Sequence, residues 1–188
     1  MKELTKFLFE TGQLSRVKRS GFSLVGVTEP HSVAEHCQRA AVIGYFLAKL
    51  EKADSHKVTL MCLFNDIHEA RIGDINKVGH RYVDCKPAES KAHTEQFESL
   101  GSEGKELLAL MTEYQQRSTH DADVARDADL LENALEAREY VTIGFKGAQN
   151  WLENIAKIIK TDSGKKLLKE IEKADPNDWW KNLKKIER

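Results

Sequence analysis

Apolar residues recur along this chain at the spacing of an α-helix, and we find no stretch with the alternation of a convincing β-strand. Ser32, with Glu35 three residues later, forms the capping-box pattern that begins a helix. In the 18 residues that follow, apolar side chains keep helical spacing with some scatter: Val33, Cys37, Ala40, Ala41, Tyr45, Leu47 and Leu50. We therefore expect an all-α helical bundle of roughly eight to ten helices.

Size and composition restrict the class of protein. The 188 residues, 40% of them hydrophobic and 31% charged, are expected to form one globular domain over 1–188. The net charge of -1 gives no reason to expect binding to nucleic acid or to an anionic membrane. No apolar run approaches the roughly 20 residues that span a bilayer. The first residues lack a signal-peptide core, and three widely spaced cysteines indicate reduced thiols, so a cytoplasmic location is expected.

The segment 63–75 contains side chains that bind metals or transfer protons. Asn65 and Glu69 are four residues apart, so on one continuous helix they would share a face, with Asp66 beside them. Asp74 follows a glycine at which we expect that helix to end. The residues before the segment are apolar, which predicts burial, and buried carboxylates must be paired, protonated or bound to metal.

Flanking segments complete the expected layout. We expect an ordered loop over 13–30 and a polar, irregular loop over 76–87 beside the site. Asp127 and Glu132 are expected to face solvent or to make local salt bridges, and the imidazoles of His31, His80, His93 and His120 are expected at the surface. Trp151, Trp179 and Trp180 are expected to be packing anchors. Further helices are expected at about 88–99, at 102–116, after a Thr119 cap, at 147–160, at 163–174 and from Pro176 onward.

Candidate metal ligands lie on three separate predicted helices. They are His36, the pair Asn65 and Asp66, and Asp129. A helical bundle can gather such residues into a cation site between facing helices. Spacing alone is weak evidence, because seven histidines and 30 acidic residues make chance groupings easy.

The order of the local motifs strengthens this interpretation. The motifs are Arg16–Phe22, Ser32–His36, Asp66–Ile75 and Ala128–Tyr140. In this order they resemble the HD-domain metal-dependent phosphohydrolases, and in detail the 5'-deoxynucleotidase branch of that superfamily. The resemblance runs from about residue 14 to residue 140, so 141–188 is expected to add accessory helices.

The resemblance implies roles for the site residues. His36, Asp66 and Asp129 would bind one divalent metal ion, manganese, cobalt, magnesium, zinc or iron, with Asn65 in the position of a fourth ligand. Glu69 would be the catalytic acidic residue and Asp74 a second carboxylate near the reacting phosphate.

The resemblance also implies the partner. Arg19, with Arg16, would contact the phosphate of a small nucleotide substrate, and Phe22 would shape the nucleoside pocket. The implied reaction is removal of the 5'-phosphate from (deoxy)nucleoside monophosphates, and the implied assembly is a homodimer.

Asn65 departs from the family, which has a histidine at this position. An amide oxygen is a harder and weaker ligand than imidazole, so the site would favour magnesium or manganese. Three interpretations stay open: an introduced inactivating change, a naturally degenerate site, and a working site with altered metal preference. The alternative functions are a non-catalytic nucleotide-binding protein and a phosphohydrolase for triphosphates or another ester. A structural role also stays open, in which Arg71 neutralises Asp66 and Glu69.

Overall fold

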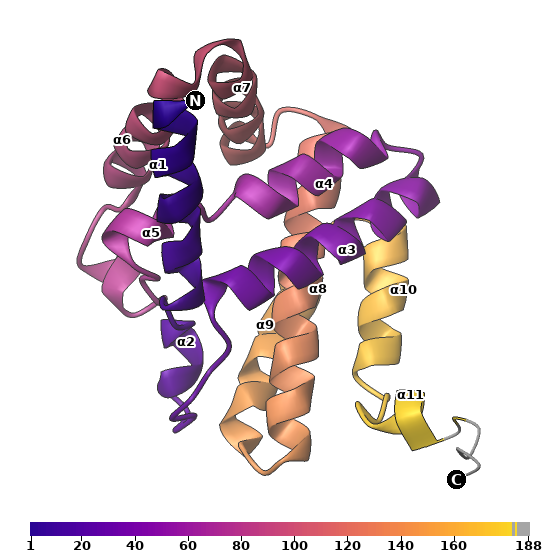
Figure 1. Cartoon of the computed structure of the whole chain (residues 1–188). Helices are drawn as coiled ribbons and strands as arrows, with labels where there is room; N and C mark the ends of the chain where they lie inside the picture. The colour runs from indigo at the N-terminus through magenta and orange to yellow at the C-terminus, as the bar shows by residue number, and fades with distance from the viewer. Residues whose placement is uncertain (182, 184–188) are drawn as a thin grey trace, which may run out of the picture.

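The computed structural model describes residues 1–181 and 183. Within them the chain forms α-helices and no named strand, and the connections range from short turns to the long segments 24–32 and 73–85 (Figure 1). Helices α2 (Ser20–Ser23), α5 (Glu69–Ile72) and α11 (Asp178–Lys181) are single turns. The longer helices are α1 (Lys2–Thr11), α3 (Val33–Glu51), α4 (Ser55–Phe64), α6 (Lys86–Phe97), α7 (Gly101–Gln116), α8 (His120–Thr142), α9 (Gln149–Ile158) and α10 (Asp162–Ile171). The all-α prediction is confirmed.

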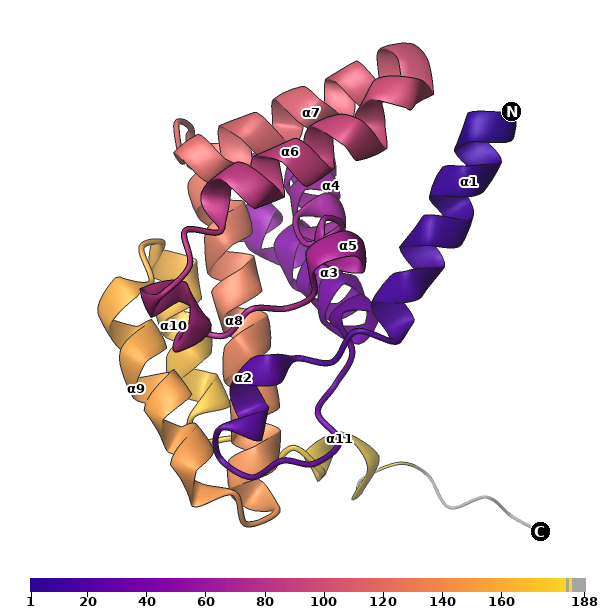
Figure 2. The ribbon, with the colours of Figure 1, turned by 90° about the vertical axis from the view of Figure 1, so that its left-hand side faces the viewer.

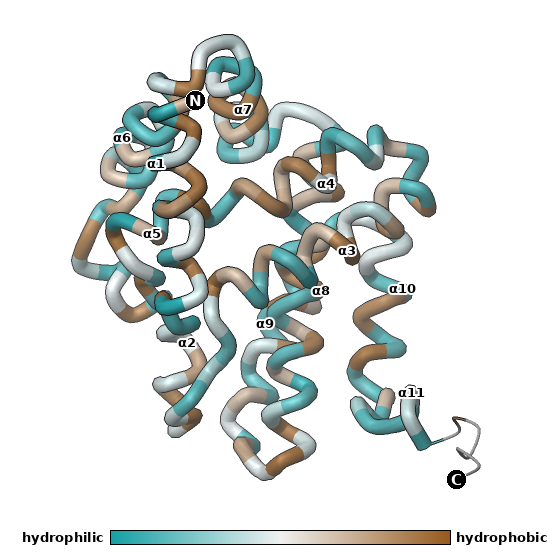
Figure 3. Tube along the Cα trace, viewed as in Figure 1, coloured by the Kyte–Doolittle hydropathy of each residue, from teal (hydrophilic) through white to brown (hydrophobic). Residues whose placement is uncertain are grey.

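Helices α3, α4 and α8 form the centre of the bundle, and each packs against the other two. Figures 1 and 2 show α9 and α10 along α8, and α6 with α7 at the opposite end of the molecule. Hydrophobic and hydrophilic stretches alternate along the tube of α10, as expected for a helix with one buried face (Figure 3).

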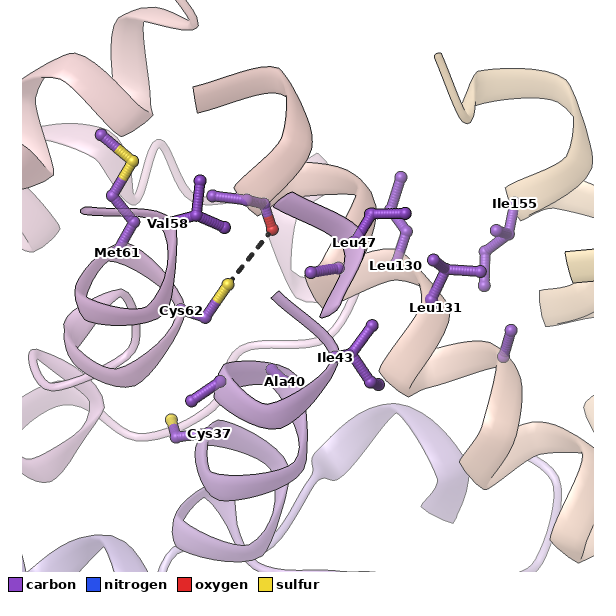
Figure 4. Close-up of a cluster of buried hydrophobic side chains, with 14 of the residues drawn as sticks. Cys37, Ala40, Ile43, Leu47, Val58, Met61, Cys62, Leu130, Leu131 and Ile155 are labelled. Carbon is purple, nitrogen blue, oxygen red and sulfur yellow. Dashed lines mark hydrogen bonds between the residues drawn. The ribbon is translucent and has the colours of Figure 1, made fainter. Parts of the chain in front are cut away.

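The apolar core lies between these central helices, where α3 and α4 approach closely (Figure 4). Gly44 on α3 faces α4, and a Cβ atom there would lie 2.8 Å from the Cys62 sulfur and 3.2 Å from a Val58 methyl carbon. The Cys62 thiol donates to the backbone oxygen of Ala125 on α8 at 3.6 Å (Figure 4). A side chain larger than hydrogen at residue 44 would force the two helices apart.

Side-chain caps fix where the central helices begin. The predicted capping box at α3 is present, with Ser32 and Glu35 each accepting from the other's backbone N–H. Thr119 accepts from the Ala122 N–H at the start of α8, and Asp54 caps α4. The predicted starts of α3 and α8 are confirmed.

Other expectations were wrong. The segment 13–30 contains a 3₁₀ turn and α2 rather than only loop. The helix expected to run to Gly73 ends at Phe64, and four residues of turn lead into α5, so Asn65 and Glu69 do not share a continuous helix. Trp179 and Trp180 are 74% and 50% exposed and lie outside the apolar core of the described residues, whereas Trp151 stacks on Phe22.

No helix among the described residues has the length and apolar character to cross a membrane.

Candidate metal centre

Three of the predicted ligands meet where α3, α8 and the turn after α4 converge. The His36 Nε2 atom lies 2.9 Å from Asp129 Oδ1 and 3.2 Å from Asp66 Oδ2. All three side chains are buried, and their ligand atoms lie within 4.8 Å of one another. Residues 93 positions apart in the chain, His36 and Asp129, thus present an imidazole nitrogen and a carboxylate to one point.

Glu132 determines how His36 faces this point. Its carboxylate, fully buried, contacts the Nδ1 atom of His36 and is held from the other side by Arg39, whose Nη2 lies 2.8 Å away. Because Nδ1 donates to Glu132, Nε2 is the ring nitrogen that faces Asp66 and Asp129 and that would bind a metal ion. The expectation that Glu132 faces solvent was wrong. Its position one turn after Asp129, on the face of α8 that meets α3, was the available signal.

The two carboxylates of the centre are ionised. Burial acts to raise the pKa of Asp66, but the hydrogen bond from His36 and the charge of Arg19 outweigh burial and lower that pKa. Burial likewise opposes ionisation of Asp129, whose pKa is lowered by Arg126 and His36. One imidazole and two ionised carboxylates fit a divalent cation, and they are a costly group of residues to bury without one.

Asn65, the fourth predicted ligand, lies at the C-terminus of α4 beside the other three. Its side-chain amide donates to Asp66 Oδ1 at 2.7 Å, so its nitrogen, as placed, faces the cluster. The backbone oxygen of Asn65 is 3.0 Å from His68 Nδ1 and 3.2 Å from His93 Nε2. Ligation through the amide oxygen would need the amide to turn over, and it stays a prediction.

His93 is buried against this turn, so its predicted surface position was wrong. Burial and the neighbouring His68 lower its pKa to about 4, and its ring stacks on Phe97. A neutral imidazole at this place supports the backbone that carries Asn65 and Asp66. Asp127 was also expected at the surface, but it is buried and accepts from the backbone N–H groups of Lys160 and Thr161.

The two predicted catalytic carboxylates border the centre. Glu69 is buried, and its Oε2 atom has no hydrogen-bond partner in the described part of the chain. Burial, reinforced by Asp66 and Asp74, raises the pKa of Glu69 well above its usual range. Asp74 Oδ2 accepts from the Ser20 N–H at 2.9 Å, and burial raises the pKa of Asp74. Among the described residues Arg71 pairs with Glu10 and Glu95, so it does not neutralise Asp66 and Glu69.

Arg19, the residue before α2, lies near two carboxylates of the site, those of Asp66 and Asp74. Its guanidinium lies 3.7 Å from Asp66 and 3.9 Å from Asp74, and it donates to Asn133 Oδ1 at 2.7 Å. Asn133 in turn donates to the backbone oxygen of Asp129 at 2.9 Å. Sequence reasoning missed Asn133, which lies one turn after Asp129 on α8.

The other two predicted substrate contacts lie elsewhere. Arg16 is exposed and donates to the Gln13 side chain at 3.3 Å. The ring of Phe22 is 1% exposed and packs against Tyr140 and Trp151, with centroids 5.0 and 4.9 Å away. In this arrangement Phe22 is a core residue without a surface for a nucleoside, and both substrate roles stay predictions.

Comparison with known proteins decides the family. The sequence pattern of the HD domain matches residues 11–172, most of the chain and all of the residues of the centre. The chain belongs to the HD domain family. The match extends past residues 14–140, which carry the motifs, and includes most of the helices that follow them.

Relatives of this HD-domain protein include named enzymes. It is 32% identical to 5'-deoxynucleotidase HDDC2 of Dictyostelium discoideum over 149 residues, 74% of this chain and 78% of the relative. It is 30% identical to the human 5'-deoxynucleotidase HDDC2, over 77% of this chain and 72% of that protein.

Solved structures share the fold. The PH0347 protein of Pyrococcus horikoshii OT3 superposes with a TM-score of 0.78 at 29% identity, over 90% of this chain and 98% of that one. The HD phosphohydrolase DatZ of cyanophage S-2L, with dA and one catalytic Zn²⁺ ion bound, has a TM-score of 0.56 at 17% identity, over 88% of this chain and 96% of that one. This second likeness is one of fold alone.

Proposed function

We propose that this HD-domain protein is a metal-dependent phosphohydrolase that removes the 5'-phosphate from (deoxy)nucleoside monophosphates. The observation that carries the proposal is the convergence of His36, Asp66 and Asp129, with Arg19 and the unpartnered oxygen of Glu69 beside them. The relatives named 5'-deoxynucleotidase, at 30% and 32% identity, support the substrate class.

The residues that would hold the metal ion are His36, Asp66 and Asp129, with Asn65 as a fourth ligand if its amide turns. A bound divalent ion would polarise the phosphate and lower the pKa of a coordinated water. Two carboxylates, one amide oxygen and one imidazole form an oxygen-rich set, which favours manganese or magnesium over the softer ions. The ion pairs of Arg19 with Asp66 and of Arg126 with Asp129 would have to loosen when the ion enters.

The chain's own groups supply the rest of the chemistry. Glu69, adjacent to the centre and not a ligand, would exchange a proton with the attacking water or with the leaving 5'-oxygen. Asp74, fixed by Ser20, would orient one of these two groups. Arg19 would neutralise the non-bridging oxygens of the phosphate through forked hydrogen bonds. A cytoplasmic location and a homodimer remain part of the proposal.

One observation favours a second candidate function. Asn65 stands where relatives of this type are expected to have histidine, and its amide is engaged with Asp66. A site that has lost an imidazole and binds nucleotide without turnover is therefore the alternative.

The test is phosphate release from a panel of ribo- and deoxynucleoside 5'-monophosphates with manganese or cobalt. The native chain is measured beside Asn65→His and Glu69→Gln. Turnover by the native chain, lost in Glu69→Gln, is the expected result. Turnover by the Asn65→His form alone would establish the degenerate site. Absence of turnover from both the native and the histidine form would overturn the proposed reaction.

A further inference from the structure

A second group of metal-ligating side chains lies outside the centre. His80 is in the 3₁₀ turn Gly79–Arg81, Cys85 precedes α6, and Glu89 is in the first turns of that helix. One ligand atom from each of the three lies within 4.8 Å of the others. Figure 2 shows the connection between α5 and α6, which crosses in front of α8 in this view.

Local structure brings the three residues together. Cys85 is the N-cap of α6, and its backbone oxygen accepts from the Glu89 N–H at 2.9 Å, so the two side chains are one helical turn apart on the same face. The Asn76 side chain accepts from the N–H groups of Val78 and Gly79 at 3.0 and 3.2 Å. This turn reverses the chain and directs His80 back toward Cys85.

Side-chain packing contributes little to holding this segment in place. Its large apolar side chains are exposed: 48% for Val78, 84% for Tyr82 and 54% for Val83. Cys85 is the exception, since it is only 3% exposed and its thiol donates to nothing stronger than the Val83 oxygen at 3.6 Å. An open pocket of about 420 Å³ is lined by residues 80–86, which include His80 and Cys85, so there is room beside the thiol for an ion and its water.

We propose that His80, Cys85 and Glu89 bind one Zn²⁺ ion, with a water molecule in the fourth position. Zinc accepts nitrogen, sulfur and carboxylate ligands together, whereas magnesium and calcium do not take thiolate. On binding, the S–H bond of Cys85 breaks, the sulfur bonds to zinc, and the proton leaves to solvent. Thiolate and carboxylate together carry two negative charges, which match the charge of the ion.

The ion would also fix the chain next to the candidate centre. The segment begins directly after Asp74, which is anchored on its other side by the Ser20 N–H and hydroxyl, each 2.9 Å away. Ile75 lies against Gly79, where an added Cβ would come within 2.7 Å of its methyl carbon. Zinc at His80, Cys85 and Glu89 would join this packed turn to α6 and so limit the movement of Asp74.

Cobalt is the probe for this site, because a thiolate–cobalt bond gives a near-ultraviolet charge-transfer band that nitrogen and oxygen ligands do not give. The purified chain is titrated with Co²⁺ while the absorbance is recorded. We expect the band in the native chain, its loss in Cys85→Ser, and its retention in Cys62→Ser and Cys37→Ser. The two retained variants are matched controls, since each makes the same change at another buried cysteine.

His80→Ala keeps the test valid if Cys85→Ser folds poorly, because His80 is exposed and its loss disturbs no packing. We expect this variant to weaken cobalt binding by about tenfold or more. Asp129→Asn should keep the band, which separates this site from the proposed catalytic centre. No band in the native chain, a band that survives Cys85→Ser, or a band lost only in Cys37→Ser would overturn the proposal.

Discussion

Helices α3, α4 and α8 enclose two parts of the protein interior, one lined by charged side chains and one by apolar side chains. Where His36 and Arg39 on α3 face Asp129 and Glu132 on α8, the space between the helices is filled by charged groups. Farther along α3, Gly44 lies against α4 and Ala128, and the interior is apolar. Burying charge costs stability, whereas burying hydrocarbon provides it. We infer that the apolar part holds the helices so that the charged part can be kept ready for a cation.

The largest expected effect would come from a ligand carboxylate. Asp129→Asn keeps the shape but removes a charge from the centre, and we expect turnover to fall by about 10³-fold, since metal assistance is worth several kcal/mol. The melting temperature should also fall, because Arg126 and His36 lose a buried ionised partner. Phosphate release and thermal unfolding measured on one preparation test both statements. Asp123→Asn on the same helix is the control, and equal losses in both variants would contradict a special role for Asp129.

A substitution in the apolar part should lower stability and leave turnover unchanged. Leu47 is 1% exposed, and Leu47→Ala is expected to lower the free energy of unfolding by about 2–5 kcal/mol. At a temperature where the variant is folded, its kcat should equal that of the native chain. Urea unfolding followed by steady-state assays checks this, with Leu50→Ala, at an exposed position of α3, as the control. A large fall in kcat would show that the two interiors are not separable.

Arg19 should give a smaller effect on turnover. Arg19→Lys keeps the charge but loses the forked donor geometry toward Asn133 and the carboxylates. We expect kcat/KM to fall by about 10–100-fold, because a hydrogen bond to a charged group is worth about 1.5–3 kcal/mol. The exposed Arg16 takes the same substitution as a control. If Arg16→Lys had the larger effect, the phosphate contact would belong to Arg16.

The smallest effect is expected at a charged pair near the surface. The Arg71 hydrogen bond, with help from Gln96, lowers the pKa of Glu10, which joins α1 to α5. A lowered pKa stabilises the fold above the unfolded pKa of about 4.3 and ceases to do so as the pH falls through the folded value.

Glu10→Gln should therefore cost about 0.2–1 kcal/mol at neutral pH, and this cost should shrink as the pH falls through the folded pKa of Glu10. Denaturant midpoints at neutral and at acid pH measure the difference. Glu3→Gln, an exposed change on the same helix, should show no such dependence. A cost that persists in acid would assign the effect to packing rather than charge.

The sequence alone predicted the structure correctly where a local hydrogen-bonding pattern determines it. Ser32 with Glu35, and Thr119, begin helices for local hydrogen-bonding reasons, so the starts of α3 and α8 were predictable. The order of the acidic and histidine motifs was enough to name the residues that meet at the centre. Their meeting point depends on contacts between residues more than 90 positions apart, which no local pattern records.

Sequence alone failed where tertiary contacts override local preference. The segment after Phe64 continues a helical pattern, but the chain turns there because His93 and His68 approach the backbone oxygen of Asn65. Glu132 has the composition of a surface residue and becomes buried only because α3 supplies His36 and Arg39 opposite it. The exposed positions of Trp179 and Trp180 likewise follow from where α11 lies, which their apolar character did not reveal.

Gly44 sets the distance between α3 and α4, and its consequence reaches beyond packing. His36 lies two turns before Gly44 on α3, and Asp66 follows the end of α4. The close approach of α3 and α4 at Gly44 therefore also affects the distance between these two proposed ligands. A methyl group added at this residue would widen the gap that a cation must bridge, even though it touches no ligand. In the proposed metal centre, selectivity for ions of different radius would therefore depend partly on the absence of a side chain at residue 44, in the apolar interior.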